Sequence, residues 1–410
     1  MISELSEFAA RLRQALTSCG RSWVTAGENT SVAATGRASL LTQAAPIEHQ
    51  HPLAADFSTL AIELFGLQFR HNQVYRRLCE ASGVTPDTLS DWTAIPCVPT
   101  ATFKEMEVTC LPAAERLRVF CSSGTTTHRP SRHFHNAESL ALYEASAWTW
   151  FARQMMATFQ SERAPVRLAV LTPPPAQVAH SSLVHMFEVV RRNLGAAETV
   201  FLGRVTAAGE WELPSERVIG WLRTACASDT PSLVLGTAFN LVHLMDRLSA
   251  QGLRFALPPG SRVMETGGYK GRSRSLPKAE LHAMISDRLG VPPSHIVCEY
   301  GMSELSSQAY AGVAGAPAPA AGESGCGLPT PADVFRFPPW ARAQVMSPET
   351  GCEVGEGETG LIRVFDLANV FSVMAIQTED LGVRRGAGFE LVGRAGWAEP
   401  RGCSLLAAEA

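Results

Sequence analysis

The strongest constraint on the fold is a repeated alternation of short apolar segments with segments of helical spacing, between residues 160 and 300. Because parallel strands need a long crossover connection, usually a helix, this order predicts an α/β fold with a largely parallel sheet flanked by helices. Strands are predicted over residues 166–172, 198–202, 232–236, 262–265 and 295–299, with helices over 182–194, 216–227, 239–251 and 281–289 between them.

The chain after this region has a different character. Residues 312–331 are rich in Gly, Ala and Pro and predict a loop, and residues 345–366 predict a hairpin that ends in a strand. We therefore expect a small β-rich part over about 325–390. It would belong to a large domain of residues 56–390, and residues 391–410 would form a hinge-like motif and a short tail.

The N-terminal region predicts an amphipathic helix followed by a long, partly mobile connection, together residues 1–55. Ile2, Leu5, Phe8, Leu12 and Leu16 recur at helical spacing, so the helix is expected to pack on the body or to contact a partner. The connection is expected from residue 20 to residue 52. Further helices are predicted over 56–81, ended by Gly83, and over 136–159, where Asn136 is a plausible N-cap.

Composition excludes several classes of protein. The net charge is only −4, which gives no electrostatic footprint for nucleic acid or an anionic membrane. None of the ten cysteines forms a C-x-x-C pair, so a zinc ribbon or a disulfide framework is not expected. No apolar run approaches the roughly 20 residues that cross a bilayer, and charged residues interrupt the N-terminus where a signal peptide would be apolar. A soluble, cytoplasmic protein is the expectation.

A hydroxyl-rich segment, Ser122-Ser123-Gly124-Thr125-Thr126-Thr127, follows an apolar run and is closed by Pro130. Its backbone N–H and side-chain O–H groups suit phosphate oxygens. It is not a Walker A loop, because no Gly-Lys-Ser/Thr follows at the required spacing. The alternative is a solvated turn that caps a strand.

Other chemical groups also stand at predicted strand ends, where ligands gather in open α/β sheets. Gly267-Gly268 would allow backbone to approach a planar ligand, and the alternative is an ordinary tight turn. The run Tyr300-Gly301-Met302-Ser303-Glu304 combines an aromatic ring, a hydroxyl and a carboxylate, which could stack on a base, contact phosphate and hold Mg²⁺. Asp380 could accept two ribose hydroxyls, and Gly393-Arg394 follows it.

Taken together, these motifs resemble those of the adenylate-forming (acyl-CoA synthetase-like) superfamily. The Ser/Thr segment resembles its Ser-Gly-Thr-Thr-Gly loop, residues 300–304 its Tyr-Gly-x-Ser/Thr-Glu motif, 378–380 its Thr-Gly-Asp and 393–394 its Gly-Arg hinge. The run Glu299–Gln308 and the ending Arg401-Gly402-Cys403-Ser404-Leu405 are most similar to LuxE-type acyl-protein synthetases. The resemblance covers about residues 55–405.

The resemblance implies an enzyme that uses ATP and Mg²⁺ to convert a carboxylic acid to acyl-AMP. The expected acid is a fatty acid. Ser122–Thr127 would cradle the β- and γ-phosphates, Ser303 would contact the α-phosphate, and Glu304 would bind Mg²⁺. Gly267, Gly268, Tyr300 and Gly301 would flank the adenine end, Asp380 would hold the ribose, and Arg394 would reach ribose or phosphate.

The chain also departs from the superfamily pattern. Thr127 stands where a Gly is common, Ser131 where many relatives carry Lys, and Glu379 in place of the Gly of Thr-Gly-Asp. The mobile C-terminal domain of full-length relatives and its catalytic lysine are not expected here. The large domain, the tail and a partner subunit would then manage both half-reactions.

Cys403 is the candidate acyl acceptor, because LuxE-type enzymes carry an acylated cysteine at a similar C-terminal position. The acyl group would then pass to an acyl reductase subunit. Coenzyme A or a carrier-protein thiol is the alternative acceptor, with Cys403 structural, and a degenerate nucleotide-binding scaffold is the non-enzyme alternative. Cys121 and Cys298 fall within apolar strands, where packing is expected.

Histidines are numerous near the Ser/Thr segment. His128, His133 and His135 lack an acidic or Cys partner at ligand spacing, so phosphate or surface contacts are expected rather than a metal site. His180 could line an acyl pocket, although a role in the core or as a helix cap fits it better.

Overall fold

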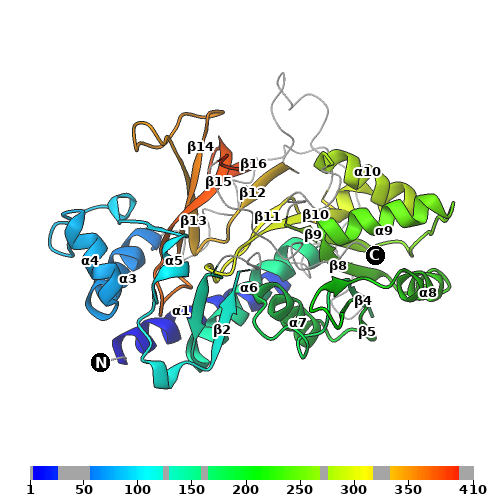
Figure 1. Cartoon of the computed structure of the whole chain (residues 1–410), viewed down its shortest axis with the longest axis horizontal. Coiled ribbons are helices and arrows are strands. Elements are labelled where there is room, and N and C mark those ends of the chain that lie inside the picture. Colours follow the sequence, from blue (N-terminus) through cyan, green and yellow to red (C-terminus); the bar gives the residue numbers. More distant parts are fainter. Residues whose placement is uncertain are drawn as a thin grey trace, which may run out of the picture.

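The computed structural model describes residues 3–25, 56–122, 129–157, 165–267, 276–316 and 333–396 (Figure 1). Its main feature is a twelve-stranded sheet in which a parallel half and an antiparallel half meet at one strand, β10 (Ile296–Tyr300). This arrangement confirms the predicted α/β class with a parallel-rich sheet and a β-rich C-terminal part.

The parallel half runs from β10 to the edge of the sheet. The order is β10, β9 (Arg262–Thr266), β8 (Ser232–Thr237), β4 (Arg167–Val170) and β5 (Glu198–Phe201), every neighbouring pair being parallel. All residues of β8, β9 and β10 are buried, as expected for parallel strands covered on both faces.

Helices cover both faces of this half. Leu233 and Leu235 of β8 belong to the core that includes α7 (Ser182–Leu194), whereas Val234 between them belongs to the core under three other helices. Those helices are α8 (Ser215–Cys226), α9 (Ala238–Ala250) and α10 (Lys278–Leu289), which gather at one end of the molecule in Figure 1.

The antiparallel half continues from β10 to the other edge. Its strands are, in order, β11 (Ala309–Ala311), β12 (Val334–Arg336), β16 (Gly388–Arg394), β15 (Ala375–Arg385), β14 (Thr359–Asp366) and β13 (Ala341–Met346). In addition, β1 (Val98–Pro99) pairs with β15 in parallel.

Two short ribbons lie outside the large sheet. One is formed by β2 (Arg118–Cys121) and β3 (Arg132–His135), and joins the two sides of the Ser/Thr segment. The other, β6 (Arg204–Val205) with β7 (Trp211–Glu212), was not predicted, because strands of two residues carry no readable alternation.

The N-terminal helix α1 (Ser3–Thr25) packs on the body against α3 (Phe57–His71) and α6 (Ala137–Met156). Four of its five predicted apolar positions are buried and the fifth, Ile2, lies outside the described residues. The helix runs five residues past the expected boundary at residue 20. Residues 26–55 lie outside the described ranges, so the predicted connection stays a prediction.

The predicted helix over residues 56–81 is divided. Asn72 ends α3 and caps α4 (Gln73–Ala81) by accepting a 3.1 Å hydrogen bond from the Tyr75 N–H. Asn136 caps α6 as predicted, in a reciprocal capping box with Ser139. Shorter helical turns are α5 (Thr102–Glu105) and the 3-10 turns η3 (Trp92–Ala94), η4 (Ala113–Glu115) and η5 (Pro293–His295).

Candidate active site

The predicted site residues that the structure describes gather where β9 and β10 end and the antiparallel strands begin. Gly267 directly follows β9, whereas Ser303 and Glu304 follow β10 after its last residue, Tyr300. In open α/β sheets, ligands bind at the carboxyl ends of the parallel strands. The fold places these groups at those strand ends, where a ligand would be expected.

Tyr300, Asp380 and Arg394 form one polar cluster. Asp380 and Arg394 are direct cross-strand partners on β15 and β16, with Arg394 Nε 3.6 Å from Asp380 Oδ1. The Tyr300 hydroxyl donates a 2.8 Å hydrogen bond to Asp380 Oδ2, and burial raises the pKa of Tyr300 further above its ordinary value. The phenol therefore stays neutral and acts as a fixed donor.

The Tyr300 ring is held by aromatic neighbours. Its centroid lies 5.3 Å from that of Phe389 and 6.0 Å from that of Phe335, both in edge-to-face orientation. Rings at these distances attract through their quadrupoles and bury a large apolar area. The aromatic packing fixes the position of the hydroxyl relative to Asp380.

Glu379, the residue that departs from the Thr-Gly-Asp pattern, points at the same arginine. Its Oε2 accepts a hydrogen bond from Arg394 Nη2. Arg394 is thus held between the carboxylates of two consecutive residues of β15. The sequence flagged the substitution but not this consequence, which depends on the register of β15 against β16.

Ser303 and Glu304 are buried and contact each other. Ser303 Oγ donates to Glu304 Oε2 at 3.0 Å and lies 3.3 Å from the hydroxyl of Ser131, which stands at the far end of the Ser/Thr segment. The structure therefore brings the ribbon of β2 and β3 against the end of β10.

His133 completes this contact. Its Nδ1 lies 2.9 Å from the carbonyl oxygen of Ser303, and because that oxygen can only accept, Nδ1 carries the proton. Burial lowers the pKa of His133 to about 4. His133 and His135 are both buried, so the expectation that they make surface contacts is wrong, and His133 instead joins the ribbon to the backbone of Ser303.

A buried network that the sequence did not reveal supports the backbone after Glu304. Asn369 Nδ2 donates to the Glu304 carbonyl at 2.9 Å, and Asp366 accepts from the backbone N–H groups of Ser306 and Ser307 at 2.9 and 2.8 Å. Asp366 ends the apolar strand β14, and a carboxylate after an apolar strand is the signal that could have indicated it.

Another buried carboxylate, Glu299 of β10, lies opposite Thr266 at the end of β9. It accepts a hydrogen bond from the Thr266 hydroxyl, yet burial raises its pKa to about 7. A Cβ at Gly301 would come within 2.5 Å of Glu299 Oε1, so a larger residue there would force the Glu299 carboxylate to shift. Gly267 has a φ of +74°, which suits glycine at the turn after β9.

The sequence relationships agree with this geometry. A family model described as "Acyl-protein synthetase, LuxE" matches residues 29–410, which is most of the chain. The chain belongs to the LuxE family. It is therefore an enzyme of the ligase class.

Curated relatives of this LuxE-family chain include two proteins named long-chain-fatty-acid–luciferin-component ligase. The one from Vibrio harveyi is 22% identical over 368 residues, covering 86% of this chain and 87% of the relative. The one from Aliivibrio fischeri is 20% identical over 357 residues, covering 84% and 86%.

Solved structures establish the fold of the LuxE-family chain. A 2-hydroxyisobutyryl-CoA ligase in complex with 2-HIB-AMP superposes with a TM-score of 0.57 at 16% identity, over 89% of this chain and 74% of that protein. The same ligase in an open conformation gives 0.55 at 17% identity, over 89% and 82%. The predicted adenylate-forming fold is thereby confirmed.

Part of the predicted LuxE-type site lies outside the described residues. This applies to Ser123–Thr127, Gly268 and Cys403, whose roles stay predictions. Ser122, where the Ser/Thr segment begins, and Ser131, which follows the segment, are described and pair with each other. The Ser131 N–H donates to Ser122 Oγ at 2.9 Å, and the Ser122 N–H donates to the Ser131 carbonyl at 3.2 Å.

The cysteines that burial affects in this LuxE-family member are poorly suited to nucleophilic attack. Burial raises the pKa of Cys79, Cys97 and Cys110 to about 12, and it also raises the pKa of Cys121 and Cys298. Since the thiolate is the nucleophile, these thiols are unreactive at neutral pH. Cys298 is buried in β10, as predicted.

Within the described ranges, no cluster of three or more His, Cys, Asp or Glu side chains has the arrangement of a metal site. No helix within the same ranges combines the length and apolarity needed to span a membrane.

Proposed function

We propose that this LuxE-family ligase uses ATP to activate a carboxylic acid as acyl-AMP and then transfers the acyl group to a cysteine thiol. The observation that carries the proposal is the meeting of Tyr300, Asp380 and Arg394 with Ser303 and Glu304 at one edge of the sheet. Catalysis of this chemistry depends mainly on positioning and on neutralising charge.

The cluster around Asp380 would hold the nucleoside. Asp380 retains acceptor capacity for ribose hydroxyls, because each carboxylate oxygen accepts more than one hydrogen bond and Oδ2 receives one from Tyr300. Arg394 would contribute a cation beside the ribose or phosphate. Gly267, Gly268, Tyr300 and Gly301 would flank the adenine.

Ser303 and Glu304 would act at the α-phosphate. A carboxylate oxygen of the acid attacks the α-phosphorus, the new P–O bond forms, and the bond to the β-phosphate breaks with loss of pyrophosphate. Ser122–Thr127 would bind the β- and γ-phosphates, so the ends of that segment need to lie near Ser303, and Ser131 Oγ lies 3.3 Å from Ser303 Oγ.

The residues present fit Mg²⁺. This ion is usually held by one or two carboxylates together with substrate phosphates and water, rather than by a complete protein cage. Glu304, buried and adjacent to Ser303, offers one such carboxylate. When bound there, Mg²⁺ would neutralise charge on the phosphates.

For the second half-reaction we propose Cys403 as acceptor. Its thiolate would attack the acyl carbon, forming a thioester and releasing AMP, while the thiol proton passes to solvent. The raised pKa values of the buried cysteines argue against those thiols as acceptors. Coenzyme A or a carrier-protein thiol is the competing acceptor.

We further propose a fatty acid as substrate and an acyl reductase subunit as the recipient of the acyl group. The support is the name of the two curated relatives, which are long-chain-fatty-acid ligases. Comparing fatty acids of different lengths as substrates would measure the preferred acyl chain length.

ATP–pyrophosphate exchange with a series of fatty acids tests the first half-reaction. Exchange should require an acid and Mg²⁺, and Glu304→Gln should lower it by about a hundredfold or more, since a buried charge that acts on the phosphates is lost. Glu358→Gln, on an exposed turn, is the matched control and should behave as wild type. Absence of exchange with every acid tried would favour a nucleotide-binding scaffold.

Labelled acid with ATP tests the acceptor. Label should remain on the protein after denaturation, be released by hydroxylamine, and be lost in Cys403→Ser, with Cys352→Ser as the control at an exposed cysteine. Full labelling of the Cys403→Ser protein would exclude Cys403.

A further inference from the structure

The ribbon formed by β2 and β3 depends on its neighbours for its position. It has only two strands and pairs with no other described strand. A two-stranded hairpin alone is at best marginally stable in water. The location of Ser122 and Ser131, at the ends of its connection, is therefore set by the contacts that the ribbon makes with the body.

One side of the ribbon is held by Ser303, through Ser131 and His133. The opposite side is held by the segment that leads into α7. The Cys121 N–H donates to the carbonyl of His180 at 2.9 Å, and His180 Nδ1, 3.2 Å from the Val119 carbonyl, donates in return. His180 is exposed and bound to β2, and Ser181 is the N-cap of α7, so the expected role of His180 in the core or as a helix cap is wrong. A place for His180 in the acyl pocket stays a prediction.

His185, in the first turn of α7, makes a third contact on this side. Arg118 Nη1 lies 3.0 Å from His185 Nδ1. A guanidinium can only donate, so Nδ1 must be the acceptor and the ring proton must sit on Nε2. His185 is buried, and its ring lies 5.2 Å from that of Phe120 in β2.

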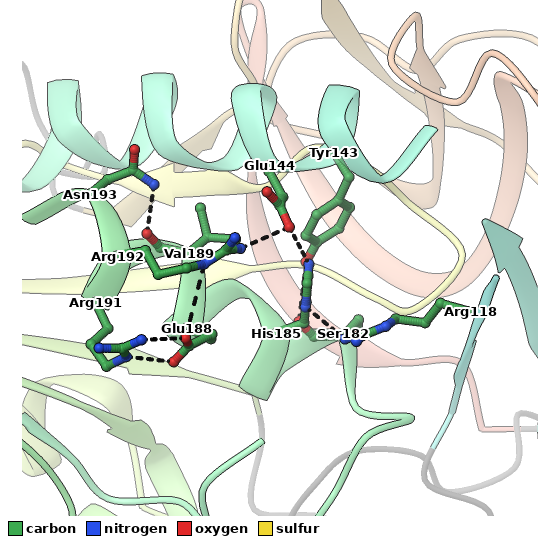
Figure 2. A network of polar contacts seen from close by, with 10 residues as sticks. All are labelled: Arg118, Tyr143, Glu144, Ser182, His185, Glu188, Val189, Arg191, Arg192 and Asn193. Atoms are coloured by element: carbon green, nitrogen blue, oxygen red, sulfur yellow. Dashed lines mark hydrogen bonds and ion pairs between the residues drawn. The ribbon is translucent and has the colours of Figure 1, made fainter. Parts of the chain in front are cut away.

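The other ring nitrogen faces α6. His185 Nε2 lies 3.0 Å from Glu144 Oε1, which is ion-pair distance without the alignment of a hydrogen bond. Arg192 donates to the same oxygen at 2.7 Å. Partial burial alone would raise the pKa of Glu144, but His185 and Arg192 outweigh it and lower the pKa to about 2. Figure 2 shows Arg118, His185, Glu144 and Arg192 as one continuous line of contacts from β2 to α6 and α7.

We propose that His185 is a positioning residue, whose Nδ1 accepts a hydrogen bond from Arg118 and thereby fixes the ribbon, and with it Ser122 and Ser131, relative to Ser303 and Glu304. The inference rests on the proposed function, because it takes Ser122–Thr127 to bind the phosphates of ATP. His185 itself contacts neither substrate nor phosphate.

Two substitutions separate the two contacts of the ring. In His185→Asn the amide oxygen stands near the place of Nδ1 and can accept from Arg118. In His185→Gln the longer amide reaches the place of Nε2 and keeps the contact with Glu144, but leaves Arg118 without its acceptor. His71→Gln is the matched control, because His71 Nε2 lies 3.1 Å from Glu4 Oε2 between α3 and α1, away from the ribbon.

Hydrogen–deuterium exchange of peptides from residues 118–135 measures the anchoring. In His185→Gln these amides should exchange about tenfold faster, in line with loss of one hydrogen bond from a charged donor. His185→Asn and His71→Gln should remain close to wild type. Equal acceleration in His185→Asn and His185→Gln, or none in either, would overturn the proposal.

ATP–pyrophosphate exchange measures the consequence for the site. In His185→Gln the KM for ATP should rise about tenfold while kcat changes less than about threefold, because the reacting groups remain. An unchanged KM in a protein whose ribbon exchanges faster would refute the positioning role. If wild type itself shows no pyrophosphate exchange, the proposed function fails, and the deuterium experiment still decides whether His185 anchors the ribbon.

Discussion

The hydroxyl of Tyr300 donates a 2.8 Å hydrogen bond to Asp380 Oδ2, which joins the last residue of the central strand β10 to the antiparallel strand β15. The bond crosses the boundary between the two halves of the sheet. It fixes a carboxylate on the antiparallel half relative to the strand end that carries Ser303 and Glu304. Both halves are therefore needed to build the proposed nucleotide site.

Tyr300→Phe tests this relationship. The ring and its aromatic contacts are retained, and Asp380 loses one donor, so the KM for ATP should rise roughly three- to tenfold. Tyr75→Phe is the control, since its buried hydroxyl donates to the Pro96 carbonyl at 2.9 Å away from the site. That variant should lose about 1 kcal/mol of unfolding free energy and keep its KM. An equal KM in Tyr300→Phe and wild type would argue against Asp380 as the ribose ligand.

The two consecutive carboxylates on β15 make a prediction about Arg394. With Glu379→Gln, Arg394 loses one carboxylate partner and keeps Asp380, so it should draw closer to the group proposed to bind ribose. The KM for ATP should then rise about three- to tenfold in pyrophosphate exchange. Glu390→Gln breaks a comparable pair with Arg385, at 3.1 Å on the same two strands, and should leave KM unchanged. A similar rise in both variants would point to a general effect on the strands.

The parts of the fold that the sequence predicted are those with local causes. The helix Ser182–Leu194 has the bounds expected from its spacing, and Asn136 caps α6, because periodicity and capping depend on neighbouring residues. The contact of His133 with Ser303 spans 170 residues, and that of Asn369 with Glu304 spans 65. Contacts of this kind depend on the order and register of the strands, and these cannot be predicted from a local sequence pattern. The candidate site residues were predicted from motif resemblance and stay predictions, whereas the contacts around them required the structure.

Asp366 should be a major contributor to stability. It is fully buried and accepts hydrogen bonds from Ser306, Ser307 and Ala368, while burial raises its pKa. Asp366→Asn would turn an amide NH₂ toward some of these donors and should lower the unfolding free energy by about 2–4 kcal/mol. Urea denaturation measures this loss. Asp287→Asn, at a side chain that is 42% exposed and paired with Arg254, should change stability by less than about 1 kcal/mol.

The raised pKa of Glu299 predicts that the free energy of unfolding falls as the pH rises. Its pKa is about 7 in the folded protein against an ordinary value of 4.5, because burial disfavours the charged form. The folded state therefore holds the proton more tightly than the unfolded state. The resulting stabilisation is complete below about pH 4.5 and is lost as the pH rises to about 7, amounting to roughly 3 kcal/mol over that interval.

Glu299→Gln removes this titration while keeping an oxygen acceptor for Thr266. Relative to wild type, the variant should become progressively more stable between pH 5 and pH 7.5, as measured by urea denaturation at fixed ionic strength. Glu212→Gln is the control, because its pKa is lowered by Arg204 and it titrates below this interval. If the difference between Glu299→Gln and wild type stays constant with pH, the carboxyl of Glu299 is not held in its neutral form by burial.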